Sequence, residues 1–170
     1  MLKVLFICSG NSCRSQMAEA LARKAYSRRI AAYSAGIAAH GLDPDAVRVM
    51  AEVGIDISGQ RSKCVEEYRD MPFDIVVTLS ERAKAECPAF LNAARHVHYR
   101  LESPLRSPKP FRTESERLAP FRRARAQTAD MIDAISTLFR QRAADVSGRA
   151  FASLAGPPDS STCRDDCRVP

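Results

Sequence analysis

The sequence lacks any hydrophobic run long enough to cross a membrane. The longest apolar stretch near its start is residues 4–8, whereas a membrane-spanning helix needs roughly 18 residues. A charged leader with an apolar segment and a cleavage site, which would indicate a signal peptide, is also missing. We therefore expect a cytoplasmic protein without a membrane partner, in a compartment that keeps thiols reduced.

Aromatic residues are scarce, at 6% of the chain. The net charge is +6, which raises the question of an anionic partner. Much of the positive excess lies in residues 100–125, where eight arginine and lysine residues accompany three glutamates. Only Phe111 and Phe121 lie among them, whereas surfaces that bind single-stranded nucleic acid combine basic with aromatic side chains. A solvated basic surface is the favoured interpretation, and nucleic acid is not an expected partner.

The sequence also lacks a metal-binding pattern. The histidines His40, His96 and His98 have no ligand spacing, and Cys163 and Cys167 have no neighbours to complete the four ligands of a zinc site. A chain of 170 residues buries enough surface to need no disulfide scaffold. The six cysteines are therefore expected to stay free of structural bridges, which leaves their thiols available for catalysis or redox exchange, and we predict no metal and no tightly bound cofactor.

What the sequence does contain is an alternation of strand and helix patterns. Asp43, Pro44 and Gly54 give one helix its start and stop signals, while Pro120 is expected to break or begin the last helix. Such alternation predicts an α/β fold, a mostly parallel sheet with helices on both faces. We expect one catalytic domain, residues 1–144, and a flexible cysteine-containing tail, residues 145–170. The strands are expected at 2–7, 31–34, 74–79 and 96–99, and the helices at 16–28, 43–53, 81–86 and 113–144.

The loop between the first strand and the first helix, residues 8–15, is where we expect the chemistry. Its N–H groups can converge on a tetrahedral anion at the helix start, and Gly10 and Asn11 permit the left-handed turns that this requires. Arg14 can bind two oxygens of the anion through its guanidinium group. The predicted oxyanion-binding residues are Ser9, Gly10, Asn11, Ser12, Cys13 and Arg14.

Cys8 ends the first strand, below the predicted anion. The helix dipole and the loop amides favour its thiolate form, so Cys8 is the expected nucleophile. Ser15 can donate its hydroxyl to that thiolate, and Asn11 can fix the loop by bonding to neighbouring backbone. A lone cysteine near an arginine would be read as structural, but the complete set at a strand–helix junction indicates catalysis.

The Cys-x5-Arg pattern of residues 8–14 resembles that of the low-molecular-weight protein tyrosine phosphatase superfamily, and most closely its arsenate reductase branch. Residues 10–19, 34–36, 54–58 and 77–79 carry the resemblance, which spans about residues 3–104. It implies a four-stranded parallel sheet flanked by helices, and a Cys8 that attacks phosphorus or arsenic. The favoured function is a thiol-dependent arsenate reductase that converts arsenate to arsenite.

A reductase needs a further thiol to attack the arsenic adduct of Cys8. Cys87 matches a redox cysteine of the reductase branch, but Ser80 stands where the branch carries another. The adduct could be resolved by Cys87, which we favour, by Cys163 or Cys167, or by an external thiol. Thioredoxin, glutaredoxin and low-molecular-weight thiols are the candidate external reductants.

The alternative function is a low-molecular-weight phosphatase that hydrolyses aryl phosphates. A phosphatase needs an acid for its leaving group, which the superfamily supplies from an Asp-Pro pair. This chain has Ser103-Pro104 there, with Glu102 one residue earlier, and this weakens the phosphatase interpretation. A third possibility is an idle oxyanion-binding module, against which the intact Cys8 and Arg14 argue.

Lys63 is a further departure from the branch. Some of its reductases carry an acidic residue there, which helps to bind a potassium ion together with residues that match Asn11, Glu19 and Ser34. A lysine can place its ammonium group where the ion would lie. We therefore predict that this chain has no potassium requirement.

Overall fold

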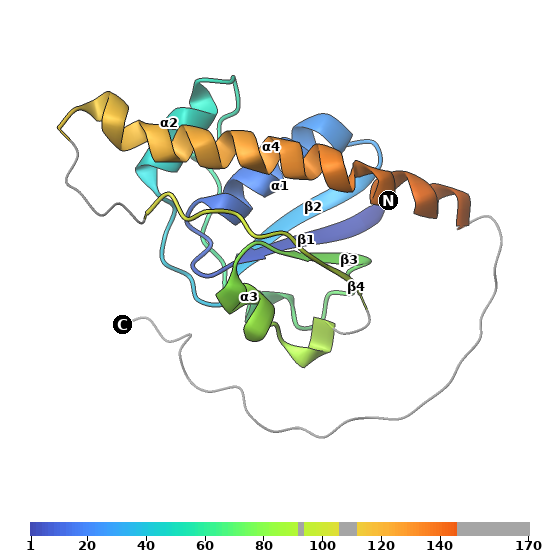
Figure 1. Cartoon of the computed structure of the whole chain (residues 1–170). Coiled ribbons are helices and arrows are strands. Elements are labelled where there is room, and N and C mark those ends of the chain that lie inside the picture. Colours follow the sequence, from blue (N-terminus) through green and yellow to red (C-terminus); the bar gives the residue numbers. More distant parts are fainter. Residues whose placement is uncertain (92–93, 106–111, 146–170) are drawn as a thin grey trace.

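The computed structural model describes residues 1–91, 94–105 and 112–145 (Figure 1). Its elements are, in chain order, β1 (Leu2–Cys8), α1 (Arg14–Tyr26), β2 (Ile30–Gly36), α2 (Pro44–Ala51), η1 (Val65–Tyr68), β3 (Ile75–Thr78), α3 (Glu81–Ala85), η2 (Ala89–Leu91), β4 (Arg95–His98) and α4 (Glu114–Asp145). The helices named η are short 3-10 helices.

The four strands form one parallel sheet in the order β2-β1-β3-β4. Strand β1 lies in the middle and is buried from Val4 to Cys8, since it is covered on both faces. In a parallel sheet all strands end at the same edge, so Cys8 lies beside Gly36 of β2 there. The predicted four-stranded parallel α/β fold is therefore confirmed.

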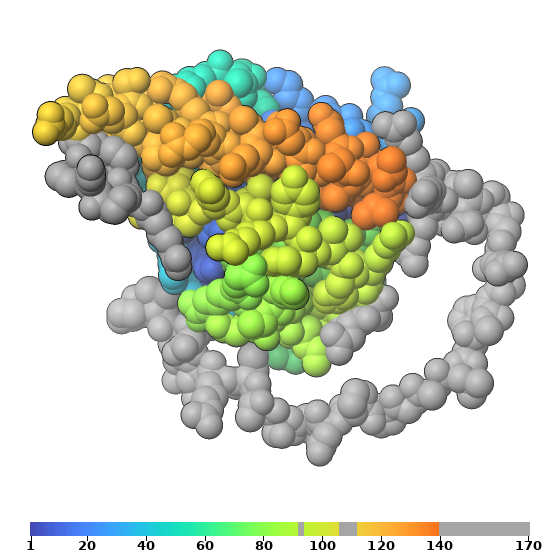
Figure 2. Space-filling view, viewed as in Figure 1, coloured from blue at the N-terminus to red at the C-terminus, as the bar shows by residue number. Residues whose placement is uncertain are grey.

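Helices cover both faces of the sheet. On one face Val4 and Phe6 of β1 pack with Ala18 of α1 and with Met131 of α4. On the other face the alternate β1 residues, Leu5 and Ile7, pack with η1, α3 and η2. Figure 1 shows α4 and α1 above the sheet and α3 below it, and Figure 2 shows α4 extending along the top of the molecule.

Most boundaries follow the local signals, and one does not. As predicted, Asp43 caps α2, by accepting a hydrogen bond from the Asp45 N–H, and Gly54 lies past its end. Gly54 is left-handed there, with φ 67°. Pro120 lies inside the continuous helix α4, so the expected break was wrong. The bond that Pro120 cannot make would go to the carbonyl group of Glu116, an exposed residue, where water can replace it.

None of the helices in the described ranges is long and apolar enough to span a membrane. The predicted tail, with Cys163 and Cys167, lies outside those ranges except for Asp145, which ends α4. Its predicted flexibility therefore remains a sequence-based expectation.

Candidate active site

The loop between β1 and α1 lies at the edge of the sheet where the strands end. Asn11 is left-handed, with φ 47°, as predicted, whereas Gly10 is not. Gly10 is instead required by a close approach, because a Cβ atom there would lie 2.6 Å from His40 Nδ1. Gly36 is equally constrained, since a Cβ atom on it would lie 2.7 Å from the Asn11 nitrogen. The loop is therefore packed tightly against the chain that follows β2.

The segment of residues 37–43 holds the loop through its carbonyl groups. The loop carbonyl groups thus bond to residues 37–43, and the loop N–H groups remain available for an anion. Within the described ranges no N–H of residues 9–13 donates a hydrogen bond to the protein. Free amides around one point form a concave anion site. The four anchoring bonds, of 3.0–3.1 Å, run from the N–H groups of Ile37, Ala38, His40 and Asp43 to the carbonyls of Cys8, Ser9, Gly10 and Ser12, respectively.

A cavity of about 500 Å³ opens over this loop. Cys8 and Arg14 line it on the loop side, and residues 100–105, after β4, line the opposite wall. In Figure 2 the recess shows dark blue atoms of the first part of the chain, between green and yellow-green ones. The remaining lining residues are Ser9, Gly10, Ser12, Cys13, His40, Ser80, Glu81 and Arg82. Five of the six predicted oxyanion-binding residues therefore line the cavity, whereas the sixth, Asn11, is fully buried and does not line it.

Cys8 is only 2% exposed, and its Sγ lies 2.9 Å from Ser15 Oγ. Ser15 Oγ also accepts a hydrogen bond of 2.8 Å from Asn11 Nδ2. The orientation of the Asn11 amide is fixed, because Asn11 Oδ1 accepts from the Lys63 N–H at 2.8 Å. The Ser15 proton is thereby directed to the sulfur, an arrangement that stabilises a thiolate.

Arg14 is oriented by two backbone carbonyl groups. Its Nη1 donates to Leu101 O at 3.0 Å and to Leu79 O at 3.4 Å. These carbonyls follow β4 and β3, so the sheet edge itself positions the guanidinium group at the cavity. The remaining donors of the fork can bind two oxygens of an anion.

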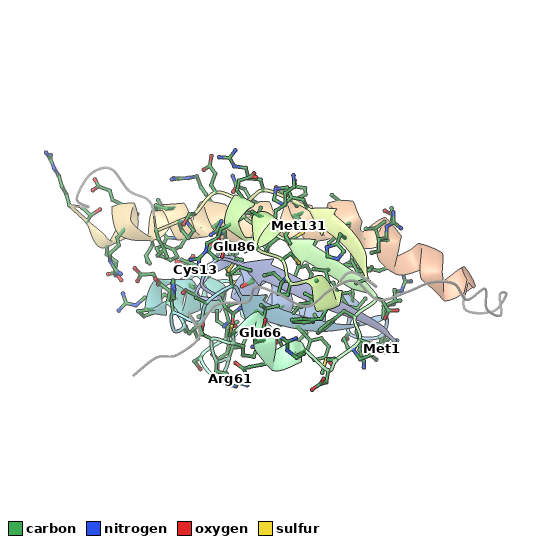
Figure 3. The ribbon with its side chains drawn as sticks, turned by 90° about the horizontal axis from the view of Figure 1, so that it is seen from below. Met1, Cys13, Arg61, Glu66, Glu86 and Met131 are labelled. Atoms are coloured by element: carbon green, nitrogen blue, oxygen red, sulfur yellow. The ribbon has the colours of Figure 1, made fainter. Side chains whose placement is uncertain are left out.

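The other cysteines differ from Cys8 in their surroundings. Cys13 is 3% exposed and packs with Met17 and Val49, and burial, helped by the Asp43 carboxylate, raises its pKa. Figure 3 shows Cys13 inside the molecule, whereas Arg61 lies at its periphery. Cys87 is half-buried against the hydrophobic cluster on the α3 side of the sheet, and burial raises its pKa. It is not among the residues that line the cavity.

Ser80, rather than Cys87, contacts the loop. Its Oγ lies 3.1 Å from Ser9 Oγ and accepts a hydrogen bond from the Ala83 N–H, which caps α3. The position at which the reductase branch carries its other cysteine is thus beside the cavity, and here it holds a hydroxyl group. A serine there cannot form a disulfide with Cys8.

Lys63 lies behind the loop, next to a buried carboxylate. Its Nζ is 3.6 Å from Glu19 Oε2, and the two side chains are 12% and 4% exposed. Glu19 also pairs with Arg23 at 2.5 Å and accepts a hydrogen bond from Ser34 Oγ. Burial lowers the pKa of Lys63, and the charge of Glu19 opposes that shift. Among the described residues no three His, Cys, Asp or Glu side chains are grouped as a metal site.

Several site contributions were not predicted from the sequence. Some of them are backbone groups, which every residue has, so the residue types in the sequence do not indicate them. These are the carbonyls of Leu79 and Leu101 and the anchoring N–H groups of residues 37–43. Ser80 and Glu102 line the cavity because β3 and β4 are neighbours in the sheet. Residues that follow two neighbouring parallel strands meet at the carboxyl edge of the sheet, and this rule could have indicated both of them.

The chain has clear relatives. The profile of the family "Low molecular weight phosphotyrosine protein phosphatase" matches residues 3–149. An arsenate reductase of Halalkalibacterium halodurans is 42% identical over 129 residues, which are 76% of this chain and 91% of the relative. An arsenate reductase of Bacillus subtilis is 41% identical with the same coverage.

Solved structures agree with these matches. An arsenate reductase in an oxidized state has a TM-score of 0.69 and 31% identity, over 82% of this chain and 99% of the other. An arginine phosphatase from Geobacillus stearothermophilus, 20% identical with a TM-score of 0.65 over 89% and 100% of the two chains, shares the fold. The predicted membership is confirmed: the chain belongs to the low-molecular-weight phosphotyrosine protein phosphatase family.

Proposed function

We propose that this chain is a thiol-dependent arsenate reductase in which Cys8 is the nucleophile. The observation that carries the proposal is the position of Cys8 Sγ below a cavity bounded by free loop N–H groups and Arg14. Its relatives of 41–42% identity are arsenate reductases, and solved reductases of 31–32% identity are described in oxidized, reduced and intermediate states. The oxidized and reduced states of these relatives support a redox role for the Cys8 thiol of this chain.

The first step uses residues already placed around the cavity. The Cys8 thiolate, stabilised by the Ser15 hydroxyl, attacks arsenic while Arg14 and the loop N–H groups bind the remaining oxygens. One oxygen of arsenate leaves as water, and a Cys8–arsenic bond forms. A second thiolate then attacks Cys8 Sγ, the bonding pair passes to arsenic, and arsenite leaves behind a disulfide.

The position of Cys87 bears on the second thiol. Cys87 lies at the far end of α3 from Ser80 and outside the cavity lining, so its direct attack would require α3 to rearrange. An external thiol can reach Cys8 through the open cavity. We propose an external reductant of the cytoplasm (thioredoxin, glutaredoxin or a small thiol) for the first attack, with Cys87 as the competing resolving thiol.

One observation favours a second candidate function. With Ser80 at its position, the cavity lining holds no resolving cysteine. The loop of residues 8–15 can also bind phosphate, which has the shape and charge of arsenate. Hydrolysis of aryl phosphates through a Cys8 phosphoenzyme would need no second thiol.

The experiment is arsenate turnover with thioredoxin, glutaredoxin or small-thiol coupling, beside hydrolysis of an aryl phosphate by the same preparation. We expect coupled arsenate turnover that disappears in Cys8→Ser. If an external thiol attacks first, Cys87→Ser keeps this turnover; if Cys87 is the resolving thiol, multiple turnover stops while aryl phosphate hydrolysis persists. Aryl phosphate hydrolysis without arsenate turnover would contradict the reductase.

A further inference from the structure

The first step of the proposed reaction needs a proton donor. The oxygen that leaves arsenic must depart as water, and a hydroxyl group such as that of Ser103 is too weak an acid to supply its proton near neutral pH. Two carboxyl groups line the cavity, those of Glu81 and Glu102.

Glu81 is committed to other contacts. Its Oε1 lies 3.4 Å from His98 Nε2 and 4.0 Å from Arg100 Nε, and it is the first residue of α3. The Glu81 carboxyl group therefore already has two partners. Glu102, by contrast, makes no hydrogen bond or ion pair with any residue in the described ranges.

The backbone places Glu102 beside the carbonyl group that orients Arg14. Leu101, its neighbour, is 3% exposed and is fixed at both ends: its N–H donates to Leu79 O at 3.1 Å, and its carbonyl accepts from Arg14 Nη1 at 3.0 Å. Glu102 is thus the residue directly after the carbonyl that orients the oxyanion-binding arginine. Its side chain lines the cavity and stays exposed, so it can exchange protons with water.

We propose that Glu102 is the general acid of this site, in a role that rests on the proposed function. The Cys8 thiolate forms a bond to arsenic of H₂AsO₄⁻ while one As–OH bond breaks. The Glu102 carboxyl group gives its proton to that hydroxyl, which leaves as water. The products are the Cys8–AsO₃H⁻ adduct and the Glu102 carboxylate, which regains a proton from solvent.

The same group serves a phosphate ester, in which it protonates the departing phenolate. A leaving group that is itself a good anion needs little help, whereas a poor one depends on the acid. The dependence of the rate on the leaving group therefore separates an acid from a residue that only shapes the cavity.

The test compares the full-length chain with Glu102→Gln, which keeps the side-chain volume, and with Ser103→Ala as the matched control. We expect Glu102→Gln to lower kcat/KM for arsenate by about 100-fold, within the usual range for a general acid. Hydrolysis of phenyl phosphate should fall by a similar factor and that of p-nitrophenyl phosphate by much less. Inhibition by inorganic phosphate should be unchanged, because the loop remains intact, and Ser103→Ala should behave as wild type.

Two results would overturn the assignment. One is a Glu102→Gln variant that keeps both activities within about twofold of wild type, which would place the acid elsewhere in the cavity. The other is an equal loss for the two aryl phosphates, which would indicate a structural effect. A wild-type chain without arsenate turnover would contradict the proposed reductase, whereas the aryl phosphate comparison would still decide the role of Glu102.

Discussion

Replacing Lys63 by methionine tests whether this lysine serves as the fixed cation behind the anion-binding loop. The variant keeps a long side chain but removes the charge 3.6 Å from Glu19 Oε2. It also removes the Nζ hydrogen bond to Arg61 O of 3.0 Å. Glu19, at 4% exposure, would then retain Arg23 and Ser34 as partners.

The magnitude follows from the geometry. At an effective dielectric constant of about 20, two unit charges at 3.6 Å attract by roughly 4–5 kcal/mol. Desolvation of the ammonium group, which lowers the pKa of Lys63, offsets part of this attraction. Because Arg23 remains 2.5 Å from Glu19, we expect a net loss of about 2 kcal/mol in the free energy of unfolding.

Urea unfolding measures this loss. With a slope of about 2 kcal/mol per molar, the midpoint of Lys63→Met should fall by about 1 M. The matched control is Lys24→Met. Lys24 is an exposed lysine of α1 whose Nζ bonds to Val53 O and to no other residue that the structure describes, so its replacement should change stability by less than about 0.5 kcal/mol. An unchanged urea midpoint in Lys63→Met would refute the reasoning. So would a wild-type enzyme that is active in a potassium salt and inactive in a tetramethylammonium salt.

Two further predictions concern thiol reactivity. Ser15→Ala removes the hydrogen bond to Cys8 Sγ. Hydrogen bonds to charged groups contribute about 1.5–3 kcal/mol, so alkylation of Cys8 by iodoacetamide at pH 7 should slow at least about tenfold. An unchanged rate would show that Ser15 does not stabilise the thiolate. Burial raises the pKa of Cys87, so its thiol stays protonated to higher pH than an ordinary cysteine. Its alkylation, followed by mass spectrometry, should therefore be slower than that of a peptide cysteine at pH 7 and should rise at a higher pH than that of the peptide. Equal rates at pH 7 would contradict this.

The active-site loop was predictable because its determinants are local. A buried strand, a short segment with Gly10 and Asn11, and a helix beginning near Arg14 follow one another within a few residues. The oxyanion site needs these elements in this order and little else. Arg14 still depends on Leu79 and Leu101, whose carbonyls come from strands that the sequence places but does not pair.

The basic segment shows what could not be predicted. Arg117 pairs with Asp45 of α2, and Arg122 Nη2 lies 2.6 Å from Glu52 Oε1, immediately after α2. These arginines therefore help to hold α4 against α2 rather than form a wholly solvated basic surface. The partners are about 70 residues apart in sequence, and only the packing of the two helices reveals them.

The outward-turned carbonyl groups of the loop have a consequence for selectivity in the cell. Residues 37–43 hold them through the fold itself, so the site is assembled before any anion arrives. Because phosphate has the same shape and charge as arsenate, the preformed loop binds both anions alike. Selection must then follow binding, because arsenic(V) in the Cys8 adduct takes the electron pair of the sulfur–arsenic bond when a thiol attacks Cys8 Sγ, and phosphorus(V) does not take the corresponding pair. The rate of reduction should accordingly follow the ratio of arsenate to phosphate, so a phosphate-starved cell would detoxify arsenate fastest.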